Sequence, residues 1–267
     1  MRADVYLSRN GHAESREQAR RLIEAGAVVL DGEMVKKPSA PIDESVPHTV
    51  TVEVPASERY VGRGGLKLEG ALDTFRVDVQ GLVALDIGAS TGGFTDCLLS
   101  RGAARVYAID SGEGQLHPRL RADARVTNIE KCNARTLTPE MIGESATLAV
   151  MDVSFISQTC ILPVIPPLLD GRGMLISLIK PQFEAGRGAV GKGGIVRRRE
   201  HREAAVRRVL ESAASVGLTC VGLTVSPITG GDGNIEYLAL FVRDIASDAR
   251  TPVDERRIRA VCEVAPR

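Results

Sequence analysis

The chain has 267 residues, 43% of them hydrophobic and 25% charged, and its formal net charge is zero. These values are ordinary for a globular protein with a buried core. The balanced charge gives no argument for a nucleic-acid or membrane partner, so such an argument needs local patches. The five cysteines are far apart and odd in number, which favours buried, reduced thiols in a cytosolic protein over disulfides or a metal site.

The first residues lack the apolar core of a signal peptide, and no apolar run reaches the roughly 18 to 20 residues that cross a bilayer. We therefore expect a cytoplasmic protein with no membrane partner and no metal.

Residues 1–54 are expected to form a compact α+β module. The segment from Ser15 to Gly26 has the signals of a helix, because Ser15 is a good N-cap and Gly26 a good C-cap. The Asp31-Gly32 pair that follows predicts a hairpin, and residues 48–54 predict a further strand. Basic residues could line one face of this module, although a solvated helix face explains them too: Arg16, Arg20, Lys36 and Lys37.

Residues 55–60 are expected to be a linker, and residues 61–245 a larger domain. A helix over its first residues would carry Lys67. Val83 to Phe94 then reads V-A-L-D-I-G-A-S-T-G-G-F. This is a buried strand that enters a glycine turn and a helix, for which Ser90 or Thr91 is a suitable cap. A second apolar strand ends in Asp110, so the pattern predicts a nucleoside-binding βαβ unit.

The turn has the spacing G-x-x-x-G-G rather than the dinucleotide pattern G-x-G-x-x-G. Asp86 beside it suits a ligand with an ammonium group and would repel a phosphate. S-adenosylmethionine fits these features, whereas the alternative is a tight turn that binds nothing. The expected cofactor-binding residues are Asp86, Gly88, Ala89, Ser90, Thr91, Gly92, Gly93, Phe94, Asp110, Asn133 and Asp152.

Strands and helices alternate through the rest of the chain, which predicts a doubly wound, mostly parallel sheet of six or seven strands. An apolar helix is expected at residues 161–169 and an amphipathic one at 200–216. A tail or terminal helix is expected at residues 246–267. The remaining strands are expected within 125–135 and at 147–151, 173–179, 218–225 and 236–242.

Three charged residues, Asp110, Asp152 and Lys180, stand where apolar strands end, so they should meet at one edge of the sheet. Glu236 opens the last strand and joins them if that strand runs antiparallel. A lysine between carboxylates is a plausible general base, although each residue alone could be a solvated loop residue.

Several stretches resemble known families. Residues 15–39 look like the RNA-binding αL motif of ribosomal protein S4. R-G-G-L-K-L-E-G-A-L, D-V-S-F-I-S, L-I-K-P-Q-F-E-A-G and G-N-I-E-Y-L resemble the TlyA family, which is described both as hemolysins and as ribosomal RNA methyltransferases with an FtsJ-like domain. The resemblance implies a Rossmann-like, S-adenosylmethionine-dependent α/β fold. It also implies methylation of a cytidine 2′-hydroxyl in the ribosomal RNA of ribosomal subunits.

By that resemblance Lys180 would be the general base, Asp152 and Glu236 would orient it, and Lys67 would complete the charge network. Phe155 could stack on the target nucleotide or pack in the core, and Arg63 would help to bind RNA. The excess of Lys and Arg between residues 180 and 208 fits an RNA track, or a solvated basic helix.

Three alternatives remain at this point. A membrane-active hemolysin would need a membrane segment and an export signal. The fold could instead be a non-catalytic RNA-binding scaffold. A methyltransferase acting on small molecules or proteins would not need the N-terminal module.

Overall fold

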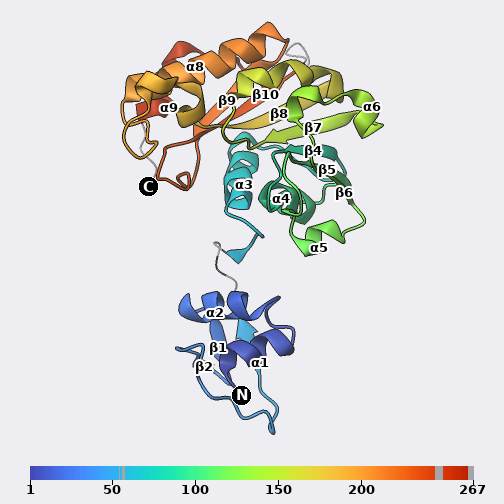
Figure 1. Cartoon of the computed structure of the whole chain (residues 1–267), viewed down its shortest axis with the longest axis vertical. Helices are drawn as coiled ribbons and strands as arrows, with labels where there is room; N and C mark the ends of the chain where they lie inside the picture. The colour runs from blue at the N-terminus through green and yellow to red at the C-terminus, as the bar shows by residue number, and fades with distance from the viewer. Residues whose placement is uncertain (54, 56–57, 244–248, 264–267) are drawn as a thin grey trace. The chain divides into compact units, whose positions relative to one another are not determined.

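The computed structural model describes residues 1–53, 55, 58–243 and 249–263, and it divides the chain into two compact units, Met1–Arg59 and Tyr60–Arg267 (Figure 1). Residues 54, 56 and 57 of the expected module and linker lie outside the described residues, as do 244–248 and 264–267 around the expected tail. Tyr60, at the end of the expected linker, is buried in the larger unit.

The first unit is a helix pair packed on a small antiparallel sheet in the order β2-β1-β3. Ser15 caps the second helix, because its hydroxyl accepts a hydrogen bond from the Gln18 N–H at 3.1 Å. Asp31 and Gly32 both have positive φ, 51° and 85°, as the tight turn between β1 and β2 requires. The elements are α1 (Ala3–Arg9), α2 (Arg16–Glu24), β1 (Val28–Leu30), β2 (Glu33–Met34) and β3 (Val50–Val52).

The larger unit is built on one seven-stranded sheet in the order β6-β5-β4-β7-β8-β10-β9. β10 runs antiparallel to both of its neighbours, and β4 to β8 pair in parallel. The predicted doubly wound α/β fold is confirmed. The strands are β4 (Val83–Ile87), β5 (Arg105–Ile109), β6 (Val126–Ile129), β7 (Ala146–Met151), β8 (Leu169–Ile179), β9 (Thr219–Val225) and β10 (Tyr237–Val242).

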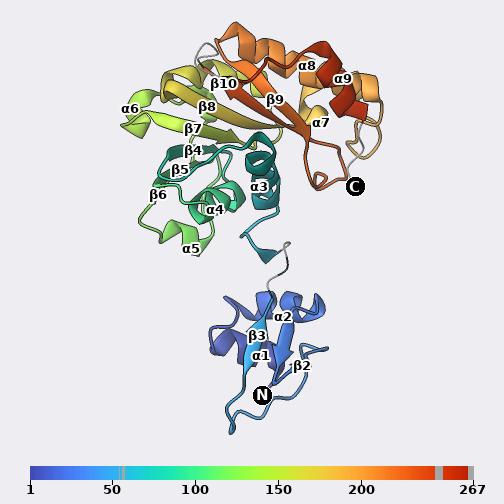
Figure 2. The same ribbon diagram turned by 180° about the vertical axis from the view of Figure 1, so that it is seen from behind.

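Helices cover both faces of this sheet (Figures 1 and 2). Alternate residues of each strand point to opposite faces, so Leu85 and Ile87 join the core under α8 and α9, whereas Ala84 joins the core under α3 and α4. The helices are α3 (Gly64–Phe75), α4 (Gly93–Ser100), α5 (Pro118–Arg121), α6 (Pro139–Ile142), α7 (Pro181–Glu184), α8 (Arg199–Ser215) and α9 (Glu255–Glu263).

The apolar helix expected at residues 161–169 is wrong. Three short 3-10 turns, η3 (Gln158–Cys160), η4 (Leu162–Val164) and η5 (Pro166–Leu168), occupy this segment, and β8 already begins at Leu169. Prolines at 163, 166 and 167 lack the N–H that an α-helix interior needs. The remaining short turns are η2 (Ala134–Thr136) and η6 (Arg187–Ala189).

The cysteines are free, and four of the five are buried, but Cys160 is exposed, which corrects the expectation of buried thiols throughout. Among the described residues, no helix has the length and apolar character needed to cross a bilayer.

The Ser15 cap gives the first testable prediction. Ser15→Ala should remove the acceptor for the Gln18 N–H and weaken α2 by about 1 kcal/mol, whereas Ser15→Gly should cost only a few tenths. Hydrogen exchange of the first amides of α2, followed in the full chain, should therefore speed up roughly fivefold in the alanine variant and little in the glycine variant. Equal rates in both variants would contradict the cap.

Candidate functional site: a cofactor cavity and two buried ion pairs

The glycine turn after β4 brings two strand ends close together. A Cβ added to Gly88, whose φ is +87°, would lie 2.5 Å from the backbone oxygen of Asp152 after β7. Only glycine permits this approach. The cap of α4 is Gly92, with φ 97° and no side-chain bond, so the expected cap by Ser90 or Thr91 is wrong. The Ser90 N–H is instead directed to the Asp110 carboxylate at 2.8 Å.

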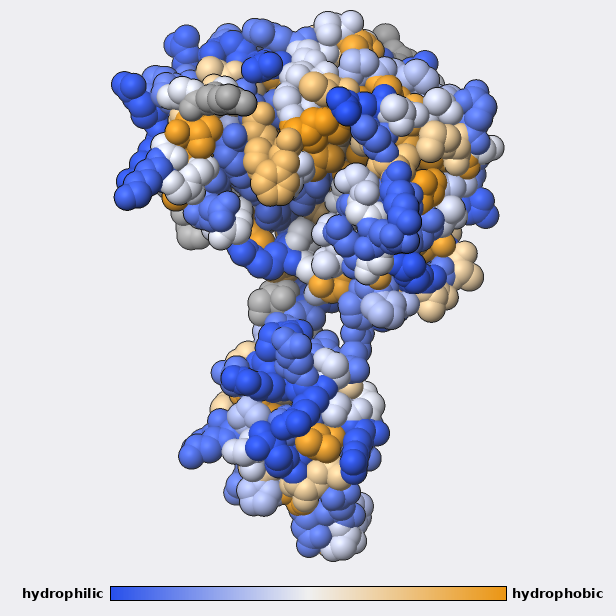
Figure 3. Space-filling model, in the orientation of Figure 1, coloured by the Kyte–Doolittle hydropathy of each residue, from blue (hydrophilic) through white to orange (hydrophobic). Residues whose placement is uncertain are grey.

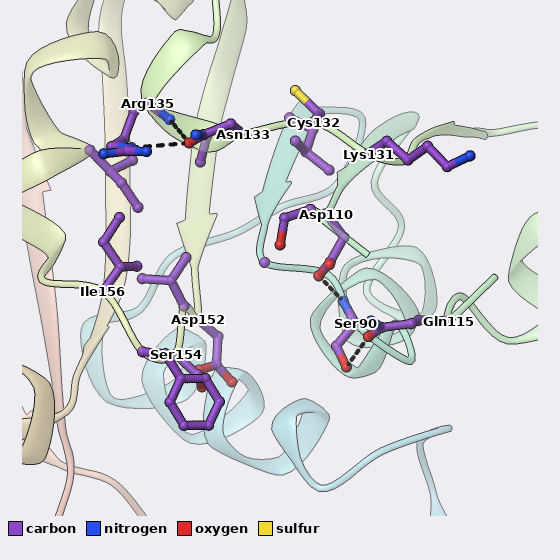
Figure 4. A pocket seen from close by; sticks show the side chains of 17 residues that line it. Ser90, Asp110, Gln115, Lys131, Cys132, Asn133, Arg135, Asp152, Ser154 and Ile156 are labelled. Atoms are coloured by element: carbon purple, nitrogen blue, oxygen red, sulfur yellow. Dashed lines mark hydrogen bonds between the residues drawn. The ribbon is translucent and has the colours of Figure 1, made fainter. Parts of the chain in front are cut away.

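A cavity of about 660 Å³ opens beside this turn (Figure 4). Asp110 lies on its wall, where Oδ2 accepts from the Ser90 N–H and Oδ1 accepts from the Gly112 N–H at 2.7 Å. Asn133 contributes to another wall, and its Oδ1 accepts from the Arg135 N–H at 3.1 Å. The cavity thus offers a carboxylate and an amide, groups that suit ribose hydroxyls and a purine edge.

A second cavity of about 210 Å³ adjoins the first, since both are lined by Gly88, Ser90, Asp152 and Ser154. Lys180 lines this smaller cavity, together with the start of α3. Of the expected cofactor-binding residues, those that line one or both cavities are Gly88, Ala89, Ser90, Thr91, Gly93, Phe94, Asp110, Asn133 and Asp152.

Asp86 and Gly92 do not line either cavity. Asp86 is fully buried, and its Oδ2 accepts from both the Thr95 N–H at 2.8 Å and the Thr95 hydroxyl at 2.6 Å. Its Oδ1 is buried with no hydrogen-bond partner among the described residues. Burial raises the pKa of Asp86 to about 7, despite the opposing Thr95 bonds. Asp86 therefore lies in the core behind the turn, and its contact with the cofactor stays a prediction.

The four residues of the expected tetrad form two ion pairs. Lys180 Nζ lies 2.7 Å from Asp152 Oδ1, and Lys67 Nζ lies 2.6 Å from Glu236 Oε2. Both lysine side chains are about nine-tenths buried. Ile179 pairs with Tyr237 across β8 and β10, so Lys180 and Glu236 leave the sheet in register. The condition under which Glu236 joins this edge, an antiparallel last strand, is met.

Two residues that sequence reasoning missed also bind the tetrad. The Lys180 ammonium donates to Ser154 Oγ at 2.7 Å, and Gln182 Nε2 donates to Glu236 Oε1 at 3.4 Å. Each lies two residues from a tetrad member, within the stretches D-V-S-F and K-P-Q-F. That proximity was the available signal, but a serine or glutamine in a loop has no preferred partner in the sequence alone.

Phe155 is 92% exposed and has a φ of 64°, so the core interpretation is wrong. A positive φ is uncommon for an aromatic residue and costs energy. Its ring lies 5.3 Å from that of Phe183, and Lys180 Nζ lies 5.9 Å from the Phe183 ring. An aromatic pair therefore stands next to the Lys180 ammonium and is open to a ligand.

A buried network holds this loop against α7. Glu184, 2% exposed, accepts from the Ser157 hydroxyl at 2.6 Å and from the Gln158 N–H at 2.8 Å. Burial raises the pKa of Glu184. Gln158 also donates to the Leu178 carbonyl of β8. The loop that carries Ser154 and Phe155 is thus fixed to the strand that carries Lys180.

The expected RNA-binding residues divide into two groups. Arg16 and Arg20 are exposed but engaged in ion pairs, with Asp4 at 2.9 Å and Glu24 at 2.8 Å. Hydrogen bonds from the Arg2 and Arg16 guanidinium groups lower the pKa of Asp4 to about 2. Lys36 and Lys37 are exposed, in a unit whose surface in Figure 3 is mainly hydrophilic.

Arg63 lies in the larger unit, at the start of α3. Its Nη2 donates to the Thr229 carbonyl at 2.8 Å, so its side chain ties the loop before β10 to the edge of the smaller cavity.

This geometry agrees with comparisons to known proteins. The FtsJ-like methyltransferase model matches residues 60–243, and the S4 domain model matches residues 1–46. The chain belongs to the FtsJ-like methyltransferase family. The resemblance to the TlyA family is confirmed, because the relatives that follow match over most of their length.

The TlyA protein of Mycobacterium tuberculosis, named as a 16S/23S rRNA (cytidine-2′-O)-methyltransferase, is 46% identical over 88% of this chain and 87% of its own. Hemolysin A of Brachyspira hyodysenteriae is 45% identical over 91% of this chain and 100% of its own. A solved structure from Streptococcus thermophilus, described as a candidate hemolysin, has a TM-score of 0.73 and 41% identity, and the match covers 98% of this chain and 94% of that one.

The raised pKa of Asp86 predicts a pH-dependent stability for this FtsJ-like methyltransferase. The pKa of this group is higher in the folded chain, about 7, than its usual 3.8. Its contribution to stability is therefore fully present below about pH 4 and is lost as the pH rises through 7. Between these values the free energy of unfolding should fall relative to that of Asp86→Asn, by up to about 4 kcal/mol at 1.36 kcal/mol per unit.

Urea unfolding of both proteins from pH 4 to pH 8 measures this difference. The asparagine oxygen can still accept from Thr95, so the variant isolates the ionisation. Parallel stability curves would show that Asp86 does not titrate in this range.

Proposed function

We propose that this protein transfers a methyl group from S-adenosylmethionine to the 2′-hydroxyl of a cytidine in the ribosomal RNA of ribosomal subunits, in the cytoplasm. The observation that carries the proposal is the buried Lys180–Asp152 pair on the wall of the cavity at the glycine turn. The buried Lys67–Glu236 pair accompanies it, because Lys180 and Glu236 leave β8 and β10 in register. The printed activity of the M. tuberculosis TlyA relative supports the choice of nucleotide and atom.

The cavity residues fit the proposed cofactor. Asp110 would accept hydrogen bonds from the ribose hydroxyls, and Asn133 would contact the adenine edge. The glycine turn would let the ligand come close to the main chain. Asp86 does not line the cavities, but in its ionised form it would favour a cationic ligand at the turn through its charge. S-adenosylmethionine, when bound, supplies an electrophilic methyl group on a sulfonium.

Lys180 would act on the substrate hydroxyl. In its amine form it would accept the proton of the 2′-hydroxyl and leave the ribose oxygen as the nucleophile for the methyl group. The sulfonium of bound S-adenosylmethionine would supply that methyl group, with its sulfur leaving in S-adenosylhomocysteine. Asp152 and Ser154 each hold the nitrogen of Lys180 at 2.7 Å, so they orient it and stabilise the ammonium that forms. Lys67 and Glu236 form the adjacent pair, which would position the ribose.

RNA would be bound by both units. Arg16, Arg20, Lys36 and Lys37 of the S4 domain would contact phosphates, which position the RNA without reading its sequence. Phe155 would stack on the target base, since it is exposed beside Lys180. A base that is turned out of its helix is commonly held in this way.

A second candidate activity, haemolysis, follows from the names of two matches, Hemolysin A of B. hyodysenteriae and the S. thermophilus structure. Release of haemoglobin from erythrocytes by the purified full chain would test it directly. The same assay with Lys180→Ala would separate lysis from methyl transfer.

Substitution of Lys180 tests the proposed base. Lys180→Ala should lower the rate of methyl transfer roughly 10²- to 10⁴-fold and leave binding of S-adenosylmethionine measurable. Lys180→Arg is the matched control, because arginine keeps the charge opposite Asp152 but stays protonated and cannot take a proton; it should be equally inactive. The measurement is incorporation of labelled methyl into subunits from a strain that lacks this gene, followed by mapping of 2′-O-methylation. Full activity of the arginine variant would refute a base at this position.

Phe155 gives a separate prediction for substrate binding. Phe155→Ala should weaken RNA binding by about 1 to 3 kcal/mol, roughly 5- to 150-fold in affinity, because a stacking partner is lost. Phe155→Tyr should restore it. The thermal midpoint should change little, since the side chain is almost fully exposed. An alanine variant that binds RNA normally would remove the stacking role.

A further inference from the structure

Hydrogen bonds connect the loop that precedes α8 to the residues just before β10, where Glu236 lies. Asn234 is only 1% exposed. Its Oδ1 accepts from the Val196 N–H at 3.0 Å, and its Nδ2 donates to the Gly194 carbonyl at 2.9 Å. The two segments lie side by side in both ribbon views (Figures 1 and 2). The buried amide therefore uses its donor and its acceptor to fix one conformation of the loop.

A second anchor stands on the other side of Glu236. Arg202 of α8 is 9% exposed, and its Nε donates to the Tyr237 hydroxyl at 2.9 Å. The same guanidinium donates to the Arg197 carbonyl at 2.6 Å and to the Cys262 carbonyl at 3.3 Å. The segment from Gly191 to Arg197 is thus held by contacts to residues on both sides of Glu236.

The structure reduces the number of candidate phosphate-binding residues in the basic track that the sequence predicts between residues 180 and 208. Several of its cations have protein partners: Lys180 with Asp152, Arg199 with Glu203 and Glu263, Arg207 with Glu255, and Arg208 with the Glu184 carbonyl. In contrast, Lys192, Arg197 and Arg198 have exposed side chains on the anchored segment or directly after it.

We propose that Lys192, Arg197 and Arg198 form an RNA-phosphate site on the larger unit, and that Asn234 is its positioning residue. This inference rests on the proposed function, because the site would hold the backbone next to the nucleotide that Lys180 acts on. A loop whose backbone is already ordered does not have to be ordered again when its cations bind, so this part of the entropic cost is avoided. Because phosphate contacts fix the register of a nucleic acid, this site would set which ribose reaches Lys180.

Two pairs of substitutions test the site through RNA binding, which does not require catalysis. Lys192→Ala/Arg198→Ala is compared with Arg105→Ala/Arg172→Ala, which removes the same charge from the opposite ends of the strands. The probe is ribosomal RNA from a strain that lacks this gene, titrated at several salt concentrations. The first pair should weaken binding at least tenfold and reduce the salt slope by about 0.7 to 0.9 per lost contact. Equal losses in both pairs would overturn the site.

Asn234 is tested with all cations in place. Asn234→Ala should raise the KM for RNA severalfold more than it lowers kcat, reduce the salt slope, and leave the Kd for S-adenosylmethionine unchanged. Asn234→Asp, which keeps the acceptor for the Val196 N–H, should recover part of the loss. A lower thermal midpoint with an unchanged salt slope would show a merely structural role and overturn the assignment.

The two proposals fail in different ways. If wild type binds RNA through these cations but transfers no methyl, the phosphate site stands and the proposed function falls. If methyl transfer is normal and the Lys192/Arg198 pair behaves like its control, only the phosphate site is refuted.

Discussion

Two lysine ammonium groups are buried at one edge of the sheet, and this is possible only because each has its own carboxylate. Burial of an unpaired charge costs several kcal/mol. The partners of Lys67 and Lys180 are supplied by different strands, β10 and β7. β10 is inserted antiparallel between β8 and β9, so its first residues lie at the same edge as the carboxyl ends of the parallel strands. A parallel β10 would place Glu236 at the opposite edge and leave Lys67 unpaired.

This dependence explains why much of the site could be predicted. Apolar runs identify the strands, and in a parallel sheet their carboxyl ends coincide. We can therefore predict, without any knowledge of tertiary contacts, that Asp110, Asp152 and Lys180 lie at the same edge. The sequence does not show which lysine of the tetrad pairs with which carboxylate. The partners of Lys67 and Lys180 depend on how far side chains reach between elements that are distant in sequence.

The wrong predictions have the same cause. A serine or threonine before α4 has the local chemistry of a cap, but Gly92 occupies the cap position, and the Ser90 hydroxyl donates to Gln115 Oε1 at 3.3 Å. The placement of Asp86 also depends on a tertiary contact, because Thr95 of α4 donates to one of its oxygens inside the core. The segment before β8 is different, because a local signal was present there. Its prolines argue against an α-helix, but the prediction followed its hydrophobicity instead.

The conformation of Phe155 shows how the protein maintains a strained backbone at its site. A positive φ costs of order 1 to 3 kcal/mol unless the surroundings fix it. The chain on one side is set by the Lys180–Ser154 bond, and on the other by the bonds of Ser157 and Gln158 to Glu184. These buried polar contacts determine where the exposed aromatic ring lies. The ring therefore has a defined position although it has little packing of its own.

Charge is distributed so that the two proposed ligands would not compete. The tetrad contains two cations and two anions and contributes no net charge. Asp110 adds negative charge on the wall of the cavity, where a cationic methyl donor gains and a phosphate backbone loses. Lys192, Arg197 and Arg198 add positive charge to the loop beside Glu236, where the preference is reversed. A chain with zero net charge can therefore attract a cation and a polyanion to neighbouring places, because local fields rather than the total charge direct binding.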